Sequence, residues 1–265
     1  LIHYSDNYTN SSNYDAITVT KRRDLYDQIL GQGKAGRIDE FNAFNGEWLL
    51  KMLTLPEKER REKASIIAAY KYVNCLLINS DITWVPLSVA EMIRISGNIG
   101  LKMSESDFST YCQGTKYGVM SDDVLFVGFK DQQMYLLPLE VKVGQKQRHD
   151  KGIEQAKKLK GYLENTLFGR KDLVGHLYRG LFIKQIMMQV EKYQLYKIYS
   201  DNYFESLLKD REILLQGDYK LADIQGYIKG FVVAFVENDT FFQEDFTVID
   251  NILMAKIPGP CQNKF

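Results

Sequence analysis

The spacing of apolar residues along the chain predicts both helices and strands. Apolar positions that recur every three or four residues predict helices, and they occur in residues 21–30, 47–79, 151–167 and 172–199. Pro56 divides the second of these segments into two helices, because proline is favoured at the start of a helix. Short apolar runs bounded by turn residues predict strands, and they cover residues 123–129, 134–143 and 230–236.

The connections between these segments complete the predicted fold. Asp131 and Gln132 lie between two apolar runs and predict the turn of a hairpin. Residues 84–86 (WVP) predict a break, after which Ser88 is expected to cap a helix that Gly97 ends. Strands and helices are mixed along the chain, which predicts an α/β domain with helices packed on a central sheet.

Composition narrows the class of protein. The sequence has 34 basic and 34 acidic residues, so no global charge favours nucleic acid, and DNA binding would have to come from a local patch. Three cysteines at long spacings indicate neither a disulfide framework nor a zinc site, as expected for a reducing cytoplasm. No apolar run is long enough to span a membrane, and no signal peptide is visible.

The start of the chain predicts its domain organisation. Residues 1–20 are rich in Asn, Ser, Tyr and Asp, and the sequence begins with Leu1. We therefore expect a piece of a longer protein, in which residues 1–45 are the end of a preceding region and residues 46–265 form the main domain. The glycines of GQGKAG at 31–36 do not follow an apolar strand, which argues against a dinucleotide site.

One strand carries the candidate chemistry. Glu140 and Lys142 are two residues apart in the run MYLLPLEVKV, so the alternation of a strand puts both side chains on one face. Val141 and Val143 are expected to point the other way, into a core. A carboxylate and an ammonium on an apolar strand need partners, and a metal ion and a substrate phosphate would supply them.

An acidic pair precedes the other strand of the predicted hairpin. An Asp at 122 or 123 can come close to Glu140 if the two strands pair. Converging carboxylates form an oxygen site that suits Mg²⁺, or Mn²⁺. Such a site activates water and stabilises the leaving oxygen in phosphodiester hydrolysis. Lys142 could orient or help deprotonate the water, or stabilise the charge that develops on phosphorus.

These residues resemble a known signature. SDDVLFVG followed by PLEVKVG is similar to the D…ExK motif of the PD-(D/E)XK nucleases, although no proline precedes the Asp. The resemblance implies a restriction-endonuclease-like three-layer core with a mixed central sheet flanked by helices. It implies that Asp123, which directly precedes the strand, is the metal ligand rather than Asp122, and that Glu140 and Lys142 are catalytic.

The same resemblance implies two further site residues. Several branches of the family place a Glu on the first core helix, which corresponds here to Glu91 as a third metal ligand. Several branches place a Gln on the helix after ExK, which corresponds to Gln155, although position 159 is Leu where a fuller motif has Tyr. Glu91 could instead pair with Arg94 on a helix surface.

Longer stretches of the sequence are similar to a narrower group. NGEWLLKML, KASIIAAYKYV and WVPLSVAEMIRISG resemble the nuclease-like region of bacterial DNA phosphorothioation-dependent restriction proteins. That resemblance implies a DNA endonuclease of a defence system in the bacterial cytoplasm, with an ATPase or helicase among its partners. Two alternatives stay open: an inactive module of the same fold that binds DNA or holds a complex together, and a structural domain of an ATP-driven machine.

A basic segment follows the ExK strand. Residues 140–171 contain nine Lys or Arg against four Asp or Glu. Such side chains could neutralise DNA phosphates, which gives affinity without sequence preference. The alternative is an ordinary solvated helix face. The residues expected to contact DNA are Lys146, Arg148, Lys151, Lys157 and Lys158.

Overall fold

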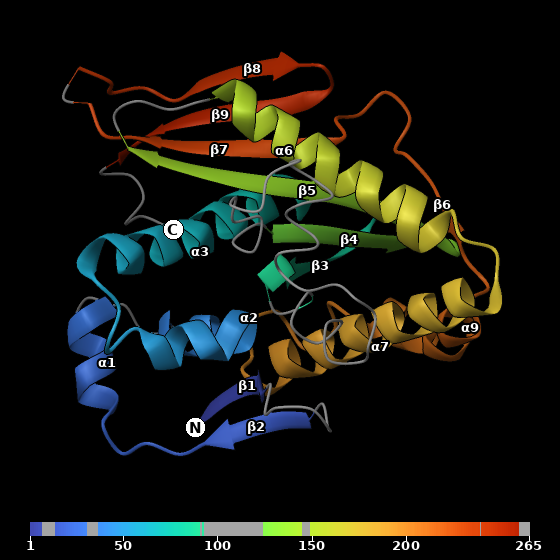
Figure 1. Cartoon of the computed structure of the whole chain (residues 1–265), viewed down its shortest axis with the longest axis horizontal. Helices are drawn as coiled ribbons and strands as arrows, with labels where there is room; N and C mark the ends of the chain where they lie inside the picture. Colours follow the sequence, from blue (N-terminus) through green and yellow to red (C-terminus); the bar gives the residue numbers. More distant parts are fainter. Residues whose placement is uncertain are drawn as a thin grey trace.

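The computed structural model shows an α/β fold in three layers, with helices on both faces of a mixed central sheet (Figure 1). It describes residues 1–6, 14–30, 37–90, 92, 124–144, 149–238 and 240–259. The predicted fold class is therefore confirmed.

The helices are α1 (Arg23–Leu30), α2 (Arg37–Lys51), α3 (Glu57–Leu77), α6 (His149–Tyr162), α7 (Leu173–Leu195), α8 (Glu205–Lys209) and α9 (Arg211–Gln216), and a π-helical turn, η1 (Leu163–Phe168), follows α6. Four helices, α1, α3, α6 and α7, lie where apolar periodicity predicts them, whereas α2 begins before the predicted segment and α8 and α9 were not predicted. Within the described residues no helix is long and apolar enough to cross a membrane. Asp172 caps the longest one, since its carboxylate accepts a hydrogen bond from the N–H of Gly175 at 2.8 Å.

The central sheet has the order β3-β4-β5-β7-β9-β8, with β6 added beside the start of β5. The first three strands are antiparallel, and β7 runs parallel to both β5 and β9. The strands are β3 (Thr83–Ser88), β4 (Val124–Lys130), β5 (Gln133–Gly144), β6 (Lys220–Leu221), β7 (Gly230–Val236), β8 (Asp245–Ile249) and β9 (Ile252–Pro258), and a separate ribbon pairs β1 (Ile2–Asp6) with β2 (Tyr14–Thr18). The longest strand, β5, is central.

Two hairpins in this sheet are closed by two-residue turns. In the β4–β5 turn, Asp131 and Gln132 have positive φ of 49° and 57°. In the β8–β9 turn, Asp250 and Asn251 have φ of 51° and 64°. Positive φ at both central residues defines the turn that matches the twist of paired strands. The predicted hairpin with Asp131 and Gln132 at its turn is therefore confirmed.

The sheet separates two apolar clusters. On one face, Phe126, Leu137 and Val233 pack against α2 and α3. On the other, Val127 and Leu136 pack beneath α6 and α7. The strands alternate between the two faces, and because both faces are covered, β4 and β7 are buried along nearly their whole length.

The break predicted at residues 84–86 is wrong, because Trp84–Pro86 lies within β3. A proline cannot donate to a strand ladder and is therefore confined to edges, and β3 is an edge strand. The side of β3 that faces away from β4 is closed by tyrosine hydroxyls. Tyr203 Oη accepts from the N–H of Trp84 at 3.2 Å and lies 3.3 Å from its carbonyl, while Tyr193 donates to the carbonyl of Pro86 at 2.7 Å.

The N-terminal segment packs on the same core. Ile2 and Tyr26 belong to the apolar cluster that contains Trp48. The domain boundary expected between residues 45 and 46 falls inside α2, where Asn45 leaves the helical conformation (φ −153°, ψ 94°). The boundary itself stays a prediction.

Candidate functional site

The candidate site lies between β5 and α6, which crosses in front of the sheet in Figure 1. Glu140 and Lys142 of β5 face α6, because a side chain at Gly152 of that helix would touch both of them. Val141 and Val143 pack against the cluster on the opposite face. The predicted alternation along the ExK strand is therefore confirmed.

Three polar side chains converge there. Lys142 Nζ donates to Glu140 Oε1 in a close ion pair and to Gln155 Oε1 at 2.7 Å. Glu140 and Gln155 are buried, with 3% and 5% of their surfaces exposed, whereas Lys142 is half-buried. Gln155 lies in the first half of α6, so the Lys142 ammonium contacts one side chain from the helix and one from β5.

The second oxygen of Glu140 is not satisfied. Oε2 is buried and has no hydrogen-bond partner among the described residues. A buried anionic oxygen without a partner is costly, so this atom suits a cation bound next to it. Carboxylate oxygens are preferred ligands of Mg²⁺. Glu140 therefore fits the predicted metal, as a ligand through Oε2.

Gly152 allows the helix to approach this closely. A Cβ at this position would lie 3.1 Å from Val232 Cγ1, 3.4 Å from Lys142 Cε and 3.5 Å from Glu140 Cγ. Sequence reasoning missed this residue. The available signal was a glycine in the first turn of a helix that directly follows the ExK strand, since an isolated glycine in a helix often has a packing reason.

The structure does not place the remaining predicted acids. Glu91, Asp122 and Asp123 lie outside the described residues, as do Lys146 and Arg148. The sequence neighbours of Asp123 and Glu140 are Val124 and Leu139, and these are cross-strand partners in the β4–β5 ladder. Among the described residues there is no group of three His, Cys, Asp or Glu side chains that could hold a metal.

The lysines of α6 are mostly engaged with the protein itself. Lys157 pairs with Asp250 of the β8–β9 turn at 2.6 Å, and Lys158 pairs with Glu154 at 2.6 Å. Lys151 is exposed and forms no ion pair with a described residue. Of the α6 lysines predicted to contact DNA, Lys151 therefore has the charge most available to a ligand.

Lys160 belongs to a structural network that the sequence did not predict. It is buried and contacts Asp223 at 2.5 Å, and Lys229 contacts the other oxygen of Asp223 at 2.5 Å. Burial raises the pKa of Asp223, but hydrogen bonds from the two lysines outweigh it and hold the pKa below its ordinary value. This network ties the end of α6 to the segment before β7.

Comparison of the chain with protein-family models, with curated proteins and with solved structures finds no match. The geometry of Glu140, Lys142 and Gln155 is therefore the feature that indicates a function.

We expect Gly152→Ala to lower the free energy of unfolding by about 1 kcal/mol, because the methyl group would lie only 3.1 Å from the fully buried side chain of Val232. The matched control is Gly161→Ala in the same helix, where the nearest atom to the new Cβ is 4.0 Å away. That variant should gain up to about 1 kcal/mol from helix propensity. Urea denaturation measures both, and equal effects at the two positions would contradict the close-packing role.

We expect Lys142→Met to leave the buried Glu140 carboxylate without its ion-pair partner. The free energy of unfolding in EDTA should fall by about 3 kcal/mol, the lower end for a broken buried ion pair, because Lys142 is partly exposed. Mn²⁺ should restore stability to this variant more than it stabilises the wild type, since the ammonium no longer competes for Glu140. In the Glu140→Gln/Lys142→Met double variant Mn²⁺ should have no effect. Equal Mn²⁺ responses in the single and double variants would rule out a cation site at Glu140.

Proposed function

We propose that this chain is a metal-dependent DNA nuclease domain of the PD-(D/E)XK type. The observation that carries the proposal is a buried carboxylate on the central strand with one oxygen held by Lys142 and the other without a partner among the described residues. Structural ion pairs usually satisfy both oxygens, whereas a site for a cation keeps one available.

The proposed metal ligands are Glu140, Asp123 and Glu91, with Mg²⁺ or Mn²⁺ as the cation. Support for Asp123 comes from the pairing of its neighbour Val124 with Leu139. The cation would supply an activated water and charge stabilisation for phosphodiester hydrolysis. Lys142 would position the water or stabilise charge on phosphorus, and Gln155 would keep the ammonium in place once Glu140 binds the cation.

The proposed substrate is DNA, and the proposed setting is restriction in the bacterial cytoplasm together with an ATPase or helicase. The resemblance to phosphorothioation-dependent restriction proteins suggests that DNA without the sulfur modification is cut. The rival function is an inactive module of the same fold that binds DNA or organises a complex. Its support is that the Lys142 ammonium itself neutralises the Glu140 carboxylate.

Incubation with supercoiled plasmid separates these functions. We expect cleavage that requires Mg²⁺ or Mn²⁺ and that falls about 100-fold or more in Glu140→Ala and Lys142→Ala, because both groups act on the transition state. Asp123→Asn should behave in the same way and Asp122→Asn should not. Lys209→Ala, on the exposed surface of α8, is the control that should cut normally.

Circular dichroism establishes that each variant is folded. Cleavage at the wild-type rate in Glu140→Ala would overturn the nuclease assignment. DNA binding without cleavage by the wild type would support the inactive module. A plasmid that carries phosphorothioate linkages should be cut less than an unmodified one if the modification is sensed.

The ion pairs of α6 predict which lysine contributes to DNA affinity. Lys151→Ala should reduce the slope of log affinity against log salt by about one, because one phosphate contact is lost. Lys160→Ala should leave the slope unchanged and lower stability instead, since Lys160 is buried against Asp223. Fluorescence anisotropy with a short duplex in EDTA, over a range of salt, gives both slopes. An unchanged slope in Lys151→Ala would show that the DNA path lies away from this end of α6.

A further inference from the structure

The Lys142 ammonium is shared between a charged acceptor and a neutral one. It donates to Glu140 Oε1 and to Gln155 Oε1, which uses two of its three N–H donors. Because an ammonium can only donate, the amide of Gln155 must present its oxygen to it. That oxygen carries no net charge, so Gln155 holds the ammonium without neutralising it. Among the described residues, the ion-pair partner of Lys142 is Glu140.

The two members of this ion pair differ in their access to solvent. The Lys142 side chain is 22% exposed, whereas the Glu140 side chain is 4% exposed. An anion can therefore bind the third N–H donor of Lys142 without uncovering Glu140. Glu140 Oε2 is buried and has no hydrogen-bond partner among the described residues. The pair thus offers a donor to an anion and an acceptor to a cation, on side chains that are in contact with each other.

Charge balance opposes the binding of either ligand alone. A phosphate that takes the ammonium from Glu140 leaves a buried carboxylate unpaired and next to a second anion, which is costly. A cation at Glu140 Oε2 lies next to the Lys142 ammonium on the other oxygen of the same carboxylate, which is also an unfavourable pairing of like charges. With both ligands bound, Glu140 pairs with the cation and Lys142 with the phosphate, so each charge has a partner.

We propose that the Glu140–Lys142 ion pair couples cation binding to DNA binding, so that each ligand raises the affinity of the site for the other. Lys142 moves from Glu140 to a DNA phosphate while Gln155 continues to accept from it, and Glu140 is released to bind the cation. This coupling rests on the proposed nuclease function and adds that DNA itself completes the cation site. Linkage requires both affinities to rise by the same factor, which is typically about 5- to 150-fold.

Binding of a short DNA duplex in EDTA, measured by fluorescence anisotropy, tests the DNA half of the coupling. We expect Glu140→Gln to bind the duplex at least about tenfold more tightly than the wild type, because Lys142 is released and no buried carboxylate faces the phosphate. A cation that merely bridges Glu140 and DNA cannot explain such a gain, since EDTA removes the cation. The matched control is Asp150→Asn, which removes an exposed acidic charge from the first turn of α6. Its DNA affinity should change by no more than about twofold, because salt screens an exposed charge.

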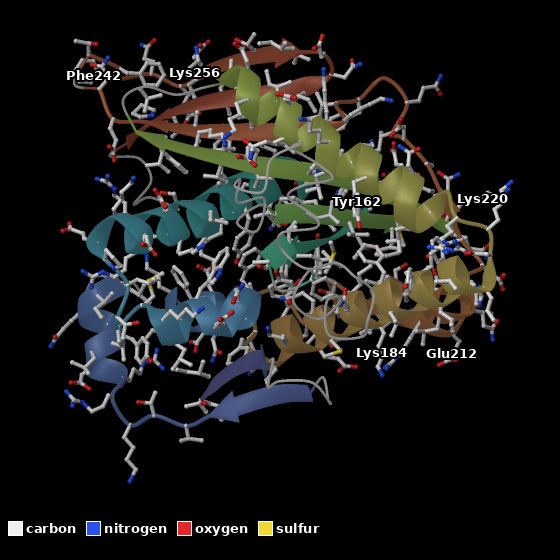
Figure 2. All side chains as sticks on the ribbon, viewed as in Figure 1. Tyr162, Lys184, Glu212, Lys220, Phe242 and Lys256 are labelled. Carbon is white, nitrogen blue, oxygen red and sulfur yellow. The ribbon has the colours of Figure 1, made fainter. Side chains whose placement is uncertain are left out.

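Binding of Mn²⁺ to the protein alone tests the cation half. We expect Lys142→Met to bind Mn²⁺ at least about tenfold more tightly than the wild type, because the ammonium no longer pairs with Glu140. The control is Lys184→Met, which removes an exposed lysine that projects from α7 away from the sheet in Figure 2 and should leave the Mn²⁺ affinity unchanged. The electron paramagnetic resonance signal of free Mn²⁺ gives the affinities. The Glu140→Gln/Lys142→Met double variant corrects for Mn²⁺ bound elsewhere on the protein.

The wild type shows the coupling directly if the cation strengthens DNA binding. In Ca²⁺, another cation that prefers oxygen ligands, the duplex should bind at least about tenfold more tightly than in EDTA at equal ionic strength. Glu140→Gln should lose this gain, because the carboxylate that binds the cation is gone. A denaturing gel of each sample establishes that the duplex is intact when its affinity is measured.

Three results would overturn the coupling. They are a Glu140→Gln variant that binds DNA in EDTA no more tightly than the wild type, an equal gain in Asp150→Asn, and an unchanged Mn²⁺ affinity in Lys142→Met. Plasmid cleavage by the wild type separates this inference from the proposed function. Loss of the coupling with normal cleavage refutes the inference alone, whereas coupling without cleavage refutes the nuclease activity and supports the inactive module that binds DNA.

Discussion

The buried ion pair between Glu140 and Lys142 is the interaction around which the centre of this fold is arranged. A carboxylate buried in a sheet is unstable without compensation, and three neighbouring features compensate it. Lys142 lies two residues along the same strand, Gln155 takes a second hydrogen bond from the ammonium, and Gly152 lets α6 close over both. The compensation is incomplete, because Glu140 Oε2 stays without a partner among the described residues. That unsatisfied atom is what makes the pair a candidate for chemistry rather than for stability alone.

The position of β5 in the sheet explains why Glu140 is buried. β5 is flanked by β4 on one side and by β7 on the other, so Glu140 sits opposite Val232 in a strand that has neighbours on both sides. Helices then cover both faces, with α3 behind β5 and α6 in front of it. The parallel pairing of β5 with β7 requires a long crossover, which α6 begins. The same crossover therefore connects β5 to β7 and places Gln155 next to Lys142.

Some lysines of α6 form ion pairs with other elements of the fold, whereas Lys151 is exposed. Lys157 pairs with Asp250 of the β8–β9 turn and Lys160 pairs with Asp223, so both lysines connect α6 to other parts of the fold. Lys151, in the first turn, keeps its charge exposed near the Glu140 site. Among the described residues, this basic helix thus has lysines in ion pairs with other elements in its second half and an exposed lysine without an ion pair in its first turn.

The sequence by itself determined the local elements and the face on which the chemistry lies. Period-two alternation placed Glu140 and Lys142 opposite Val141 and Val143, and the turn residues Asp131 and Gln132 predicted the hairpin, because both features depend on neighbours along the chain. The β3 strand was missed, because a proline is acceptable only at a sheet edge and edge position is a property of the whole fold.

Only the tertiary structure decided which charges are free. Glu154 can be matched to Lys158 from helix spacing, but Asp250 and Asp223 lie far along the chain from Lys157 and Lys160. The contact of Gly152 with Lys142 and the unsatisfied oxygen of Glu140 likewise arise from the approach of α6 to β5. Long-range pairing of this kind leaves no periodic trace in a sequence, because it is set by how the elements pack and not by the residues next to each partner.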